Sequence, residues 1–95
     1  MELIKNESEK QYEFHLDNGT IAFVEYLTET DKVYLTHTEV PKSMNGHGIG
    51  SELIRQTLQE IKKDGKKLVP LCGFVSWYVN NHDEWHSLLS DGYQM

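Results

Sequence analysis

The sequence contains a single cysteine, Cys72, and only two prolines among its 95 residues. One cysteine cannot form a disulfide within the chain, so nothing in the sequence indicates an oxidising compartment. No apolar run approaches the length that crosses a bilayer, and residues 1–6 lack the apolar core of a signal peptide. These absences favour a cytoplasmic protein. The short length predicts one domain, covering residues 1–95.

Basic residues are also scarce, because 9 Lys and Arg stand against 15 Asp and Glu and give a net charge of −6. No stripe of basic residues interleaved with aromatics is present, so nucleic acid is a poor partner. We expect a monomer with neither a nucleic-acid nor a membrane partner. The acidic balance weakly favours a cationic partner, such as an amine.

The first half of the chain has the alternation of apolar and polar residues that is typical of half-buried strands. Residues 12–16 show it first, and Asn18-Gly19 then supplies a strong signal for a tight hairpin turn. The return strand covers 20–27, and a third strand covers 33–40 after a polar turn. We therefore expect a three-stranded antiparallel meander.

An amphipathic helix follows, because apolar residues recur at helical spacing from Ile49 to Ile61. Gly65 ends this helix, and 67–71 has the pattern of a short strand. The right-handed crossover rule makes that strand parallel to the third one. The rest of the chain is expected to hold helical segments at 74–81 and 82–89 and a frayed tail at 90–95.

Three alternating glycines, Gly46, Gly48 and Gly50, join the third strand to this helix. Glycine lets the backbone turn and lets a ligand approach the amides closely. The first N–H groups of a helix have no intrahelical partner and lie at the positive end of its dipole. The segment therefore predicts an anion site, for which a diphosphate is the natural ligand.

Two common phosphate-binding loops do not fit this segment. A Walker loop needs Lys and then Ser or Thr after its last glycine, whereas Ser51 and Glu52 follow Gly50 here. The dinucleotide fingerprint needs a glycine where Ser51 stands and an acid after the next strand, which 68–71 does not provide. We expect neither nucleotide hydrolysis nor dinucleotide binding.

The segment Asn45-Gly-His-Gly-Ile-Gly50, which follows a strand ending in Val40-Pro41, resembles the pyrophosphate-binding segment of the Gcn5-related N-acetyltransferases. Residues 67–82 are similar to the second half of small, single-domain proteins of this superfamily. The order of strand, glycine loop, helix, strand and helix also matches the coenzyme-binding core. The sequence departs from the motif at Asn45, where the superfamily usually carries Arg or Gln.

The resemblance implies an α/β (α+β) fold, a minimal acetyltransferase with three antiparallel strands, the glycine loop and helix, a splayed parallel strand and C-terminal helices. The third strand would carry a bulge between Thr36 and Val40 and diverge from the parallel strand. The helices that larger relatives insert between their first two strands, where they help to form the acceptor pocket, are absent. The acceptor is therefore not readable from the sequence.

The resemblance also implies the ligand and the reaction. Acetyl-CoA or CoA would be the cofactor, and the acetyl group would pass to an amine on a small molecule or a protein. The alternative is a non-catalytic module that binds CoA or acyl-CoA. Backbone amides of the loop would hold the diphosphate, and the strand before it would hold the pantetheine arm. The implied cofactor-binding residues are Glu39, Val40, Asn45, Gly46, His47, Gly48, Ile49, Gly50 and Ser51.

Some side chains near the loop have two interpretations. Glu39 resembles an acid that some relatives use as a base through water, and the alternative is a solvated carboxylate on a strand. His47 would orient phosphate or would simply be exposed. Thr38 is the other polar side chain expected to face the slot between the diverging strands.

Tyr78 and Cys72 are the candidate catalytic residues. Tyr78 lies on the helix after the splayed strand, where the superfamily often keeps a tyrosine that protonates the leaving thiolate; otherwise it is a core or rim aromatic. Cys72 lies where the thioester would arrive, and it would accept the acetyl group if the following helix lowers the pKa of its thiol. A buried small residue is the alternative for Cys72.

No metal site is expected. His82 and His86 share a helix face, but Asp83 stands where a zinc protease carries glutamate, and spacing gives no third ligand. His82 is interpreted as a residue that makes a tertiary hydrogen bond near the cleft, and His86 as exposed.

Overall fold

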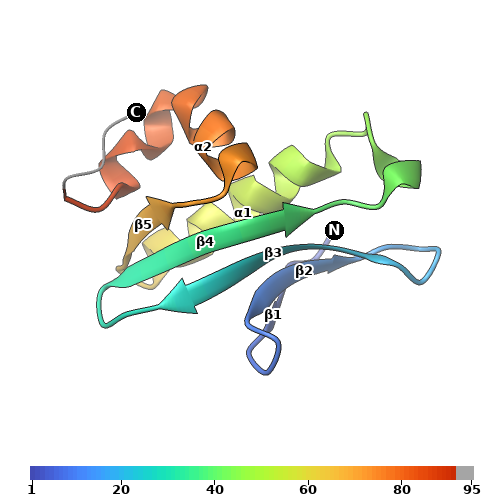
Figure 1. Ribbon diagram of the computed structural model, residues 1–95, viewed down its shortest axis with the longest axis horizontal. Coiled ribbons are helices and arrows are strands. Elements are labelled where there is room, and N and C mark those ends of the chain that lie inside the picture. The colour runs from blue at the N-terminus through green and yellow to red at the C-terminus, as the bar shows by residue number, and fades with distance from the viewer. Residues whose placement is uncertain (92–95) are drawn as a thin grey trace.

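The computed structural model describes residues 1–91, and it forms one five-stranded sheet with helices packed against it (Figure 1). The strands follow one another across the sheet in chain order. The first four are antiparallel, and the last pair is parallel. Their bounds are β1 Ile4–Asn6, β2 Gln11–His15, β3 Ile21–Thr28, β4 Lys32–Glu39 and β5 Lys67–Pro70.

The helices follow β4 and β5. A short 3-10 helix, η1 (Lys42–Met44), leads into the long helix α1 (Ile49–Lys63). After β5 come α2 (Gly73–Asn80) and a second 3-10 helix, η2 (Asp83–Leu88). Gly65 has a φ of 73°, which lets the chain turn back after α1, as the sequence predicted. Within residues 1–91, no helix is long and apolar enough to span a membrane.

One hydrophobic core lies between the helices and one face of the sheet. Alternate residues of β2, β3 and β4 point into it, and the apolar stripes of α1 and α2 complete it. The core therefore fixes α1 across the sheet, mainly against β3, and α2 against β4 and β5. Its fully buried members include Phe14, Val24, Leu35, Leu53, Leu58 and Val75.

The predicted fold class is confirmed, with an edge strand that the sequence did not predict. The three predicted antiparallel strands are β2, β3 and β4, and β1 adds a fourth beside β2. Three residues are too few to show an alternation. β1 pairs with β2 as a short hairpin, and the Asn6 side-chain amide adds a hydrogen bond of 2.9 Å to the buried Glu13 carboxylate.

Two expectations for the C-terminal part were wrong. His86 is half-buried rather than exposed, and its Nε2 lies 2.9 Å from the carbonyl oxygen of Val79. Ser90 was expected in a frayed tail, but it is buried, and its amide donates a 2.9 Å hydrogen bond to the Leu68 carbonyl. The remainder of that expected tail, 92–95, lies outside the described residues.

Candidate functional site

β4 changes its register at a bulge. Glu25 of β3 faces His37, whereas the next residue of β3 faces Leu35, so Thr36 is the extra residue on β4. The Thr36 hydroxyl donates a hydrogen bond of 3.4 Å to the Glu25 carbonyl. Before the bulge the odd-numbered residues of β4 face the core, and after it the even-numbered residues Thr38 and Val40 face the helix side. The bulge that was expected from the sequence is therefore present.

β4 and β5 diverge immediately after this bulge. Their parallel pairing ends at Leu35 and Pro70. The amides of both Leu71 and Cys72 then donate to the one carbonyl of Leu35, each at 3.0 Å, while β4 continues to Glu39 paired only with β3. A slot consequently opens between the strands at the start of α2.

The glycine loop leaves its backbone amides free. Gly46 and Gly48 have φ values of 84° and 73°, and Gly48 caps the N-terminus of α1. The first helical bond runs from the Glu52 amide to the Gly48 carbonyl, at 3.0 Å. Among residues 1–91, no backbone carbonyl accepts a hydrogen bond of good geometry from the amides of residues 46–51. This row of donors begins a helix, where the dipole also favours an anion.

A cavity of about 380 Å³ lies between the slot and these amides. Its walls come from the end of β4, the glycine loop, the first turn of α1 and the start of α2. No residue with a formal charge borders it within the described part of the chain. The lining residues are Thr38, Val40, Met44, Asn45, Gly46, Gly48, Ile49, Gly50, Ser51, Phe74 and Trp77.

The cavity brings together most of the expected cofactor-binding residues but not Glu39 and His47. Glu39 projects away from the cavity, because the bulge at Thr36 reverses the alternation, and its carboxylate lies 3.0 Å from Nε2 of exposed His37. His47 is exposed and does not border the cavity. Thr38, expected to face the slot, does border it.

Two aromatic residues of α2, which were not expected in the site from the sequence, form one wall of the cavity. The rings of Phe74 and Trp77 have centroids 5.5 Å apart and are tilted by 32°. Phe74 lies so close to α1 that a Cβ atom at Gly50 would be 3.0 Å from its Cζ. Their spacing indicated only a helical stripe, and their position at the cavity depends on this close approach between α1 and α2.

Cys72 lies at the divergence of the strands, directly before α2. Its half-buried sulfur is 3.3 Å from the Thr38 hydroxyl oxygen. Burial raises the pKa of the thiol, but the Thr38 hydroxyl and the backbone N–H groups of Val75 and Phe74 lower it more. The net pKa is below the usual value of a cysteine, as a candidate nucleophile requires.

Tyr78 points into the core rather than toward the cavity. It is 3% exposed, and burial raises the pKa of its hydroxyl. Its ring stacks on that of His82, with centroids 4.0 Å apart, and His82 Nδ1 lies 2.7 Å from the Tyr78 carbonyl oxygen. The structure therefore brings Cys72 to the point where the strands separate but leaves Tyr78 in the core. The hydrogen bond of His82 is local, four residues back along the chain, and not the tertiary bond near the cleft that was expected.

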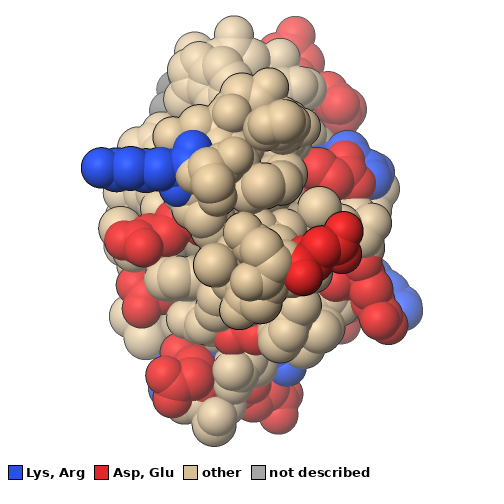
Figure 2. Space-filling view, turned by 90° about the vertical axis from the view of Figure 1, so that its right-hand side faces the viewer, with Lys and Arg blue, Asp and Glu red and all other residues tan. Residues whose placement is uncertain are grey.

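Charged side chains surround an uncharged centre on the face that carries the loop. Figure 2 views this face, with acidic side chains on both sides of the uncharged centre and a basic side chain projecting at the left. Glu52, in the first turn of α1, is paired with Arg55, whose Nε donates to its carboxylate at 2.8 Å. Hydrogen bonds from Arg55 and Gln56 lower the pKa of Glu52 to about 2. The guanidinium thus offsets a carboxylate that would otherwise repel an anion.

The described residues contain no set of side chains suited to bind a metal ion. No group of three or more His, Cys, Asp or Glu side chains gathers there with the geometry for a metal ion. His86 lies 3.8 Å from Asp83, an exposed residue, and forms no larger cluster with His82.

Comparison with known proteins points to one family. The sequence model of a family described as GCN5-related N-acetyl-transferase matches residues 11–88. A GCN5-like protein from Staphylococcus aureus, solved by NMR, has a similar structure, with a TM-score of 0.73 over 98% of this chain and 90% of that chain. The two sequences are 18% identical, so this likeness concerns the fold. No curated protein matches the sequence.

Proposed function

The chain belongs to the GCN5-related N-acetyltransferase family, and on that premise we propose that it binds acetyl-CoA and transfers the acetyl group to an amine. The row of free amides along residues 46–51 carries this proposal. These donors border a cavity of about 380 Å³ beside a strand whose backbone is open. An anionic ligand with an extended arm suits that combination.

In this proposal the diphosphate accepts hydrogen bonds from the amides of residues 46–51, and the α1 dipole adds to the attraction. The pantetheine arm pairs with the open backbone of β4 beyond Leu35, as an added strand would. Thr38 and Val40 face the arm. Asn45 also borders the cavity, but its side chain is short, so the backbone supplies most of the anion binding.

Acetyl-CoA supplies the acetyl group as a thioester. In a direct transfer the amine nitrogen forms a bond to the acetyl carbon, the carbon–sulfur bond breaks, and the CoA thiolate takes up the proton that the amine loses. In a two-step transfer Cys72 Sγ takes the acetyl group first, and CoA leaves as a thiol with the proton of Cys72. The amine then takes the acetyl group, the bond from the acetyl carbon to Sγ breaks, and Sγ takes up the proton that the amine loses. The lowered pKa of Cys72 supports the second route. Tyr78 is the weaker candidate for a proton donor because it is buried in the core.

A non-catalytic CoA or acyl-CoA-binding module is the second candidate function. No carboxylate or imidazole among residues 1–91 borders the cavity, so no side chain there would take a proton from an amine. β3 also follows β2 through a tight turn, without the helices that shape an acceptor pocket in larger relatives. Both observations favour binding without turnover.

Amine-dependent release of CoA thiol separates these functions. Purified protein would be incubated with acetyl-CoA and a panel of small amines and amine-bearing peptides, with Cys72→Ala as the matched variant. Thiol release that requires both the amine and Cys72 supports the two-step transferase. Coenzyme binding without amine-dependent release supports the module, and absence of coenzyme binding removes both.

A further inference from the structure

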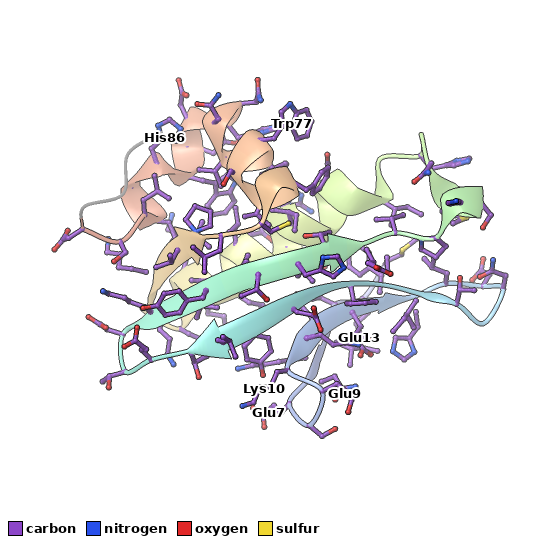
Figure 3. All side chains as sticks on the ribbon, viewed as in Figure 1. Glu7, Glu9, Lys10, Glu13, Trp77 and His86 are labelled. Atoms are coloured by element: carbon purple, nitrogen blue, oxygen red, sulfur yellow. The ribbon has the colours of Figure 1, made fainter. Side chains whose placement is uncertain are left out.

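Trp77 is a large apolar side chain on the surface, at the rim of the cavity. It is 53% exposed, although α2 buries Val75, Tyr78 and Val79 in the core. Figure 3 shows Trp77 projecting from α2 on the side toward the glycine loop. Because it also borders the cavity, one face of its ring is available beside the free amides.

Trp77 packs, through Phe74, against α1, the helix that carries those amides. Phe74 lies against the first turn of α1, where the missing Cβ of Gly50 makes room for it. Trp77 in turn lies against Phe74, with ring centroids 5.5 Å apart. The indole and the amides of Gly50 and Ser51 therefore belong to one connected wall of the cavity.

The lining of the cavity limits how a ligand is held. The bordering residues that the structure describes carry no formal charge, so no lysine or arginine of the lining reinforces the grip of the amides on a diphosphate. Affinity must then come from apolar and aromatic contacts as well. A flat ring next to an anion site suits a ligand that has a planar base attached to its diphosphate.

We propose that Trp77 is the stacking platform for the adenine base of the coenzyme, so that the protein recognises the nucleotide half of CoA as well as the pantetheine arm. This inference rests on the proposed coenzyme binding. The diphosphate anchors to the loop, the arm follows β4, and the base turns back over the indole at the rim. Trp77 is thereby a specificity residue, and the acetyl group does not touch it.

The test compares two ligands on three proteins by isothermal titration calorimetry. CoA carries the adenine, and phosphopantetheine keeps the arm and one phosphate but lacks the nucleoside. The proteins are wild type, Trp77→Ala and Trp77→Phe. Loss of one stacked base predicts that Trp77→Ala weakens CoA binding by roughly 5- to 100-fold and leaves phosphopantetheine binding unchanged. Trp77→Phe should keep most of the CoA affinity.

Leu27→Ala is the matched control, because Leu27 is also 53% exposed but lies on β3, away from the cavity. It should leave both affinities unchanged. Equal losses for both ligands in Trp77→Ala, or no loss for CoA, would overturn the stacking assignment while leaving the proposed function intact. Failure of wild type to bind either ligand would overturn both.

Discussion

The Thr38 hydroxyl oxygen lies 3.3 Å from the Cys72 sulfur, across the point at which β4 and β5 separate. The two residues are 34 positions apart in the sequence, and the divergence of the strands brings them together. Thr38 borders the cavity, whereas the thiol that it contacts lies behind it and does not itself line the cavity. This contact links the binding site to a residue with nucleophilic chemistry.

Removing the Thr38 hydroxyl should make Cys72 less reactive. The hydroxyl lowers the pKa of the thiol, so Thr38→Val raises it and reduces the thiolate fraction at neutral pH. One hydrogen bond contributes about 1 kcal/mol, which predicts an alkylation rate with iodoacetamide about fivefold lower. Thr38→Ser keeps a hydroxyl and should react as wild type does. An unchanged rate in Thr38→Val would contradict the assigned contact.

Gly48 should be required for coenzyme binding more than for folding. Its φ of 73° is left-handed, and no atom lies within 4 Å of a Cβ placed there. Gly48→Val should move the loop out of this conformation, which turns its amides away and abolishes CoA binding. The free energy of unfolding should fall by no more than about 1–2 kcal/mol, the cost of keeping the left-handed conformation. Gly48→Asn, which tolerates a left-handed backbone, is the control. Urea unfolding and calorimetry measure the two effects. Full CoA affinity in Gly48→Val would refute the proposal that the loop amides bind the diphosphate.

Gly50 and Phe74 should be energetically coupled. A Cβ at Gly50 would be 3.0 Å from the Phe74 ring, so Gly50→Ala should destabilise the wild type even though alanine favours a helix by up to about 1 kcal/mol. In a Phe74→Leu background the same change should be neutral or stabilising. A double-mutant cycle from urea unfolding should give a coupling of about 1 kcal/mol or more. A coupling near zero would mean that the packing of the Phe74 ring does not depend on the missing Cβ at Gly50.

Glu13 should make stability depend on pH in the acidic range. It is buried on the sheet face opposite the helices (Figure 3) and accepts hydrogen bonds from Asn6, Gln11 and His15 at 2.6–2.9 Å. Burial raises its pKa, but the hydrogen bonds from Gln11, His15 and Asn6 outweigh burial and leave the pKa below the usual value. The carboxylate therefore stabilises the fold above the unfolded-state pKa of about 4.3, and this stabilisation is lost as the pH falls through the lower folded-state pKa.

Replacing Glu13 with glutamine is the corresponding experiment. Glu13→Gln should lower stability at neutral pH by about 1–3 kcal/mol, because an amide group then faces hydrogen-bond donors. It should also flatten the decrease in the urea midpoint between about pH 5 and 3. Glu39→Gln, on the same face but exposed, is the control and should change neither. An identical pH profile for Glu13→Gln and wild type would count against this role.

The sequence predicted the parts of the fold that have local signals. The Asn18-Gly19 turn, the apolar spacing of α1 and the glycine pattern of the loop each depend on residues close together in the chain. β1 was not predicted because its three residues are too few to show an alternation of apolar and polar side chains. Wherever a local pattern was enough, the expected element is present.

The site was harder to predict where it depends on tertiary contacts. The bulge at Thr36 sets which residues of β4 face the cavity. Without it Glu39 would share the face of Leu35, whereas with it Thr38 and Val40 take that face. Trp77 reaches the cavity because Phe74 packs against Gly50, a contact that no spacing along the chain reveals. The direction of a side chain near a bulge or between two helices is decided by packing.

The most direct test of the proposed coenzyme site is an NMR titration of labelled protein with CoA, followed through the backbone amide signals. The proposal predicts the largest shifts for residues 46–51, with further shifts at Thr38, Val40 and Cys72. Saturable shifts confined to those residues would support both the diphosphate site at the loop amides and the pantetheine site between β4 and β5. No shift at millimolar CoA, or shifts centred on another face such as that of Glu13, would contradict the proposed coenzyme site.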